Sequence, residues 1–66
     1  MKRRDLEREL RRIAKAHGLE LVITEGGNHS KASIGTWSEP LPRHREVAEL
    51  LARAIIRRCE TELGKD

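Results

Sequence analysis

Two segments with the apolar spacing of amphipathic helices enclose a central stretch of short segments separated by glycine-containing turns, and this order most constrains the fold. The first segment carries apolar residues at intervals of three or four positions: Leu6, Leu10, Ile13 and Ala14. This spacing predicts a helix over residues 5–17. Gly18 follows where a helix commonly ends in a left-handed residue.

The central stretch is predicted to form three short strands. Residues 19–24 form a segment too short and too alternating for a helix, residues 29–34 form a more polar second strand, and residues 37–41 form a third. Gly35 marks the turn between the last two strands. Pro40 predicts that the third strand lies at an edge of the sheet, because proline donates no ladder hydrogen bond.

A second helix is predicted over residues 45–63, and Gly64 closes it. Its apolar face is expected to consist of Val47, Leu50, Leu51, Ala54 and Ile55. Ile56 is expected on the polar side of this helix. Arg58 falls within the apolar arc, and a pairing with Glu62 is expected there.

The order of elements predicts an α+β fold of the type α-β-β-β-α, in which two helices cover one face of a three-stranded antiparallel sheet. A chain of 66 residues forms one domain, which spans residues 1–66. So small a core leaves no room for a large pocket. We therefore expect a polymer bound on the outside rather than a small molecule enclosed inside.

The composition narrows the class of protein further. Lys and Arg number 14 against 11 Asp and Glu, and the single cysteine, Cys59, excludes an internal disulfide and a multi-cysteine zinc site. We expect Cys59 to act as a small hydrophobe. The basic residues 1–4 are not followed by the apolar segment of a signal peptide, and no apolar run approaches the roughly 20 residues of a membrane helix. These features favour a soluble cytoplasmic protein without a cofactor.

The first helix is predicted to carry a basic stripe opposite its apolar face. The stripe consists of Arg4, Arg8, Arg11, Arg12 and Lys15. Such a stripe can follow the phosphates of a nucleic acid, which makes Arg8, Arg12 and Lys15 candidates for RNA binding. The alternative is a solvated helix face, which arginine suits by propensity. Glu7 and Arg11 are spaced to form an i,i+4 ion pair.

His29 directly follows the turn Gly26-Gly27-Asn28, so we expect it to be exposed and positioned by that turn. An imidazole can give or take a proton near neutral pH. Lys31 is expected on the same side of the strand, where it could hold a phosphodiester while His29 deprotonates the 2′-hydroxyl. That reaction needs no metal, and the sequence offers no evident carboxylate cluster for one. The alternative is a polar surface histidine.

Arg43, His44 and Arg45 form a basic segment before the second helix, where phosphates favour the free backbone N–H groups. The alternative is a basic loop with no ligand. His17 is interpreted as structural, on the apolar side at the end of the first helix. Trp37, the only aromatic residue, is expected to pack in the core rather than stack on a base.

The Gly27-Asn28-His29 turn, the segment 42–46 and the flanking helices together resemble the HicA toxin family over nearly the whole chain. The resemblance implies a double-stranded-RNA-binding-like fold, metal-independent cleavage of mRNA, and a cognate HicB antitoxin that masks the toxin. The catalytic histidine of the family matches His29. Many members carry a second histidine directly after the first, whereas this chain has Ser30.

Three hypotheses follow. The first is a toxin endoribonuclease with His29 as general base or acid and His44 as the candidate for a second proton donor. The second is a non-catalytic RNA-binding module of the same fold. The third is a small interaction domain that binds a protein through its open sheet face or the edge of its third strand.

Overall fold

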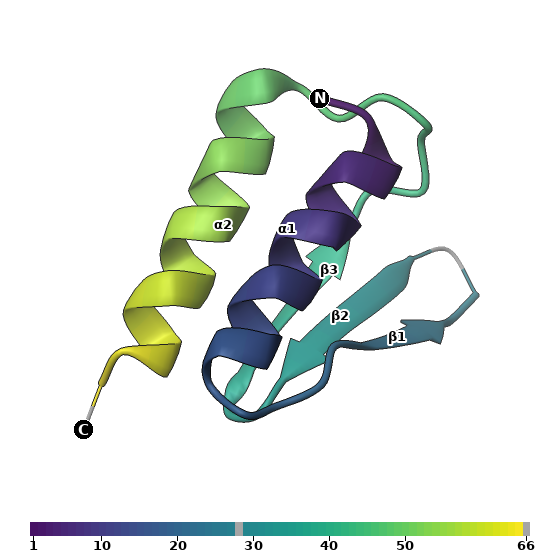
Figure 1. The fold of residues 1–66 in the computed structure, drawn as a ribbon. Coiled ribbons are helices and arrows are strands. Elements are labelled where there is room, and N and C mark those ends of the chain that lie inside the picture. The colour runs from purple at the N-terminus through teal and green to yellow at the C-terminus, as the bar shows by residue number, and fades with distance from the viewer. Residues whose placement is uncertain (28, 66) are drawn as a thin grey trace.

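The computed structural model describes residues 1–27 and 29–65. Its elements are α1 (Arg3–Ala16), β1 (Val22–Glu25), β2 (Ser30–Ile34), β3 (Trp37–Leu41) and α2 (Glu49–Leu63). The predicted order is confirmed, and both helices lie on one face of an antiparallel sheet (Figure 1). The third strand has the predicted bounds, whereas α2 begins four residues later than predicted.

α1 forms as its apolar spacing predicts, and the four apolar residues that define its face are all buried. Gly18 has φ 69°, so it lies in the left-handed region. The N–H of Leu19 donates to the carbonyl of Ala14 at 2.8 Å, and the N–H of Gly18 donates to that of Lys15 at 3.1 Å. This pair of bonds is a Schellman motif, which satisfies carbonyls that the helix end leaves free.

The sheet has the order β1-β2-β3, so β2 is central and β3 is an edge, as Pro40 predicts. Ser30, Ala32 and Ile34 of β2 are buried under the helices. Lys31 alternates with them and is exposed, because successive side chains of a strand point to opposite faces. The other face of the sheet is open in the monomer (Figure 1).

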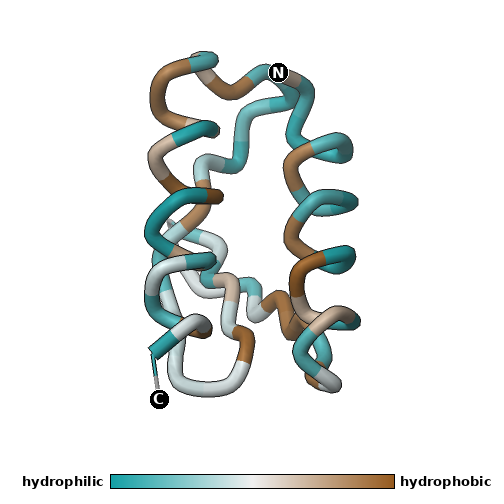
Figure 2. Tube along the Cα trace, turned by 60° about the vertical axis from the view of Figure 1, so that its left-hand side comes forward, coloured by the Kyte–Doolittle hydropathy of each residue, from teal (hydrophilic) through white to brown (hydrophobic). Residues whose placement is uncertain are grey.

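One core lies between the sheet and the helices, and the hydrophobic residues of α1 recur on the side turned toward it (Figure 2). Trp37 is 3% exposed and Cys59 is fully buried, which confirms the core interpretation of both. Burial raises the pKa of the Cys59 thiol to about 11, because it disfavours the thiolate. No helix among residues 1–27 and 29–65 combines the length and apolar character needed to cross a membrane.

The core face of α2 differs from the predicted face. Leu50 is 83% exposed and Leu51 is 41% exposed, so neither belongs to the core. The buried residues of this helix are Ala52, Ile55 and Cys59. The prediction aligned the apolar face with Val47, but Val47 precedes the helix in an extended segment, where its N–H donates to the carbonyl of Met1 at 2.8 Å.

Two further expectations for α2 are wrong. Ile56 packs against the core instead of lying on the polar side. Arg58 pairs with Glu39 of β3 rather than with Glu62: its Nε and Nη2 donate to the two carboxylate oxygens at 2.8–3.0 Å. Helical spacing indicates partners within one helix, so it could not point to a partner on a strand.

Both helices begin at the same end of the molecule (Figure 1). There the start of the chain runs antiparallel to the loop before α2, with an isolated bridge between Lys2 and Glu46. The N–H of Arg3 donates to the carbonyl of Arg45 at 2.7 Å. The start of the chain and the loop before α2 therefore share one surface at this end.

Candidate active site

His29 lies between the β1–β2 turn and the first residue of β2, and it is exposed, as predicted. It lines a groove of about 340 Å³ between the edge of the sheet and α2. The other lining residues are Glu39, Pro40, Leu41, Pro42, Leu51, Ile55 and Arg58. The groove is largely apolar, so the imidazole is the one lining group with the proton-transfer chemistry of a neutral-pH acid or base.

Hydrogen bonds hold the backbone on both sides of His29. The N–H of Gly26 donates to the carbonyl of His29 at 3.0 Å and closes the turn. The guanidinium of Arg43 donates to the carbonyl of Gly26 and pairs with the carboxylate of Glu25 at 3.4 Å. Ser30 donates through Oγ to the same carboxylate at 2.7 Å. We call Glu25, Ser30 and Arg43 the turn clamp.

Of the two turn glycines, only Gly26 lies where a side chain would meet a close neighbour. Glycines in turns commonly adopt left-handed backbone, but neither Gly26 nor Gly27 has φ in that region. A Cβ added at Gly26 would lie 3.1 Å from the carbonyl oxygen of His29, whereas one at Gly27 would meet nothing within 4 Å. Gly26 therefore permits the closing hydrogen bond. Asn28, the third residue of the predicted turn, lies outside the described residues.

The turn clamp explains a polar residue in the core. Ser30 is fully buried, and its hydroxyl is satisfied by Glu25, which faces it across the β1–β2 ladder. That hydrogen bond lowers the pKa of the Glu25 carboxyl, and the charges of Arg3 and Arg43 lower it further. Glu25 is thus a carboxylate at neutral pH, and it joins the turn to two arginines.

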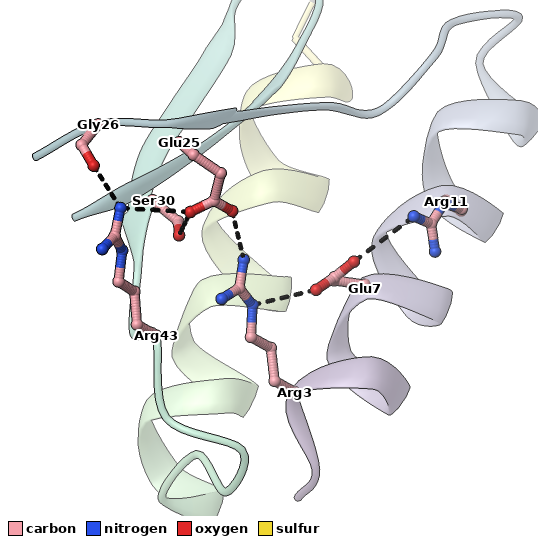
Figure 3. A network of polar contacts seen from close by, with 7 residues as sticks. All are labelled: Arg3, Glu7, Arg11, Glu25, Gly26, Ser30 and Arg43. Atoms are coloured by element: carbon pink, nitrogen blue, oxygen red, sulfur yellow. Dashed lines mark hydrogen bonds and ion pairs between the residues drawn. The ribbon is translucent and has the colours of Figure 1, made fainter.

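A chain of contacts connects the turn clamp with α1 (Figure 3). Arg3 pairs with Glu25 at 3.4 Å through Nη2 and with Glu7 at 3.0 Å through Nε. Glu7 also pairs with Arg11 at 3.5 Å, which confirms the predicted i,i+4 pair. Sequence reasoning missed Arg3, Glu25 and Ser30. The one available signal was that Glu25 and Ser30 flank the predicted turn, where a hairpin brings neighbours together.

Lys31 does not share the groove of His29. It pairs across the ladders with Thr24 and Pro40 and is exposed on the open face of the sheet. The groove instead includes Leu51 of α2, a helix on the face of the sheet opposite to the open one. The prediction placed His29 and Lys31 on the same side of one strand, but β2 begins at Ser30, so His29 precedes the strand and lines the groove without Lys31.

The three residues of the basic segment before α2 lie in different surroundings. Arg43 supports the turn, and its side chain is still 42% exposed. His44 is exposed. Arg45 is exposed and lines a second groove, of about 360 Å³, with Lys2, Arg3 and Arg4. Arg43 and Arg45 were both predicted to bind RNA, but Arg43 contacts the turn before His29 whereas Arg45 lines a different groove.

The predicted stripe on α1 is exposed along its whole length. Arg8 lies 3.8 Å from Asp5, and Arg12 lies 3.0 Å from Glu9, so acids on the same helix partly offset their charge. The hydrogen bond with Glu9 raises the pKa of Arg12. α1 still carries six basic and three acidic residues, against three of each on α2, so the positive excess of the chain lies on α1.

His17 is exposed at the end of α1, so its predicted place on the apolar side is wrong. Its backbone N–H, not its imidazole, donates to the carbonyls of Ile13 and Ala14. The reason is that residue 17 is the C-cap, with φ −101° and ψ 8°, and has already left the helical path. His17 therefore offers an exposed histidine at the far end of α1 for comparison with His29.

Glu39 connects the edge strand with α2 and with the core. The indole Nε1 of Trp37 donates a hydrogen bond to the Glu39 carboxylate at 2.9 Å, and Arg58 donates to both carboxylate oxygens. The hydrogen bonds from Arg58 lower the pKa of Glu39, and the bond from Trp37 acts in the same direction. The carboxylate thereby fixes one wall of the groove that His29 lines.

We expect Glu39→Gln to destabilise the protein by up to about 1 kcal/mol at pH 7, because the variant loses a charge-assisted pair. The folded-state pKa lies below the ordinary value of 4.5, so the contribution of Glu39 is present above that value and is lost as pH falls through the folded pKa. Urea unfolding of both proteins at several pH values should show the difference shrink below about pH 4.5. Glu20→Gln, at an exposed position, is the control. A difference that stays constant across this range would contradict the expectation.

A further groove, of about 580 Å³, lies between β3 and α2 and contains none of the predicted site residues. Its lining is dominated by polar side chains that pair with one another, such as Thr36 with Glu62 and Arg58 with Glu39. Among residues 1–27 and 29–65, no three His, Cys, Asp or Glu side chains are grouped to hold a metal ion. Comparisons with known protein families, with curated proteins and with solved structures found no match.

Proposed function

We propose that the protein is an RNA-cleaving toxin of the HicA type, which acts on mRNA in the cytoplasm and uses His29 as its general base or acid. The observation that carries the proposal is an exposed imidazole on a turn that hydrogen bonds hold from both sides. A general acid or base must be held within reach of the proton it transfers, and the turn clamp supplies such support. The resemblance to HicA toxins in the Gly27-Asn28-His29 turn supports the same assignment.

The proposed reaction is an internal transesterification of the RNA backbone. His29 takes the proton of a 2′-hydroxyl, and the resulting oxygen attacks the adjacent phosphorus. The bond from phosphorus to the 5′-oxygen breaks, and that oxygen leaves with a proton from an acid. The products are a 2′,3′-cyclic phosphate and a 5′-hydroxyl, and the step requires no metal.

His44 is our candidate for that acid. Its neighbour Arg43 donates a hydrogen bond to Gly26, so the segment that carries His44 is attached to the turn that precedes His29. Both histidines are exposed. The typical contribution of such a positioned proton donor is about 10²–10⁴-fold in rate.

A protein partner fits the apolar surface beside His29. Leu50 is 83% exposed and Leu51, which lines the groove, is 41% exposed, while β3 is a free edge strand. Exposed apolar residues next to an unpaired strand favour association with another chain. An antitoxin of the HicB type that covered Leu51 would also cover His29, which would account for inhibition.

The test is growth after induced expression of the wild type, His29→Ala and His17→Ala at matched protein levels. We expect the wild type and His17→Ala to arrest growth and His29→Ala to allow it, because only His29 lies on the supported turn. Arrest by His29→Ala would show that the assignment of the histidine is wrong. If the wild type leaves growth unchanged, the toxin proposal fails in that host. A non-catalytic RNA-binding module then becomes the better reading, with Arg8→Glu and Arg12→Glu as its tests.

A further inference from the structure

The groove of about 360 Å³ at the start of α1 is lined entirely by basic residues: Lys2, Arg3, Arg4 and Arg45. Three of these four residues were not among the predicted RNA-binding residues. They come from two segments far apart in the sequence, and the hydrogen bond from the N–H of Arg3 to the carbonyl of Arg45 holds these segments together. The isolated bridge between Lys2 and Glu46 extends the contact. We call these four residues the basic groove.

The charges of the basic groove are poorly neutralised. Lys2 and Arg45 form no ion pair with the residues that the structure describes. Arg4 has one acidic neighbour, Asp5, at 3.9 Å, and Asp5 also lies 3.8 Å from Arg8. Arg3 alone has close carboxylates, which belong to Glu7 and Glu25.

This arrangement is unfavourable for the protein alone. Like charges held close together repel one another, and an anion placed between them removes the repulsion. Arginine and lysine side chains that converge on one hollow form the donor set that binds phosphate oxygens. Among residues 1–27 and 29–65, no carboxylate lines the hollow to compete with such an anion.

The basic groove is also connected to the candidate active site. Arg3 lines the groove and pairs with Glu25, which belongs to the turn clamp. Two successive contacts therefore lead from the groove to Arg43, which donates to the turn before His29 (Figure 3). The groove and the turn that precedes His29 therefore belong to one network of contacts.

We propose that the basic groove binds a backbone phosphate of the RNA and sets the position of the strand relative to His29. The inference rests on the proposed function, since it takes RNA as the ligand, but it concerns binding and not cleavage. Lys2 and Arg45 are the residues to test, because their side chains are exposed and their backbone contacts survive substitution by alanine.

The experiment measures binding of a fluorescent single-stranded RNA oligonucleotide by anisotropy at several salt concentrations, with every protein carrying His29→Ala so that cleavage does not interfere. Lys2→Ala/Arg45→Ala is expected to weaken binding roughly tenfold. The slope of log K against log salt should become shallower by about 0.7, because the contact with one backbone phosphate is lost. Arg53→Ala/Arg57→Ala on α2, which removes the same charge, should leave both quantities near those of the parent.

Unchanged affinity of the Lys2/Arg45 variant, an equal loss in the α2 variant, or no RNA binding by the parent would each overturn the proposal. A Lys2/Arg45 variant that no longer binds poly-glutamate but still binds RNA would also overturn the proposal, because the groove would then bind an acidic protein. Failure of the proposed function can be distinguished from failure of this inference. A wild type that binds RNA through the groove but does not cleave it refutes only the catalytic role of His29. Circular dichroism of each variant verifies the fold.

Discussion

The His29→Ala variant is expected to cleave RNA about 10²–10⁴-fold more slowly than the wild type, the range that a positioned proton-transfer group supplies. The substitution removes an exposed side chain, so the free energy of unfolding should change by no more than about 0.5 kcal/mol. Single-turnover cleavage of an end-labelled RNA measures the first quantity, and urea unfolding measures the second. His17→Ala, which removes another exposed histidine, should match the wild type in both.

The products of the same reaction distinguish the proposed chemistry from other routes. A 2′,3′-cyclic phosphate on the upstream fragment indicates attack by the 2′-hydroxyl, and a DNA strand of the same sequence should then remain intact. Cleavage of that DNA would rule out a mechanism that begins at the 2′-hydroxyl. A His29→Ala variant as fast as the wild type would assign the base to another residue.

Leu10→Ala is expected to lower the free energy of unfolding by about 2–5 kcal/mol, because it leaves a cavity beneath α1 at a fully buried position. A domain of this length has a total stability of roughly 3–10 kcal/mol, so the variant should be partly or largely unfolded at 37 °C. Thermal and urea unfolding followed by circular dichroism measure the loss.

Leu50→Ala is the matched control, because it makes the same chemical change at a position that is 83% exposed. Its stability should lie within about 0.5 kcal/mol of the wild type. An effect of Leu50→Ala as large as that of Leu10→Ala would contradict the observed orientation of α2 and restore the predicted one.

The fold was predictable from the sequence wherever the deciding interactions are local. The apolar spacing of residues 6–14 and the glycine at position 18 determined α1 and its end correctly. The face of α2 was not predictable in the same way, because Val47 continues the apolar rhythm although it lies outside the helix. Its pairing with Met1 joins residues 46 positions apart in the sequence, and such a contact cannot be predicted from periodicity.

The candidate site, like the fold, was predictable only where local interactions decide the structure. The exposure of His29 follows from its place beside a turn, and the exposure of Arg8 and Arg12 follows from helical geometry. The turn clamp depends on Arg43, which reaches Gly26 across 17 positions of sequence. The basic groove joins residues 2–4 to residue 45. These contacts exist only once the chain has folded, so no spacing rule reveals them.

The shared starting point of the two helices has an electrical consequence. The peptide dipoles of a helix leave about half a positive charge at its beginning, and here both helices begin at the end of the molecule that holds the basic groove. The protein therefore has a positive pole at that end. A polyanion in solution exerts a torque on such a molecule before the two touch. The fraction of encounters in which the groove faces the polyanion is therefore larger than random orientation would give.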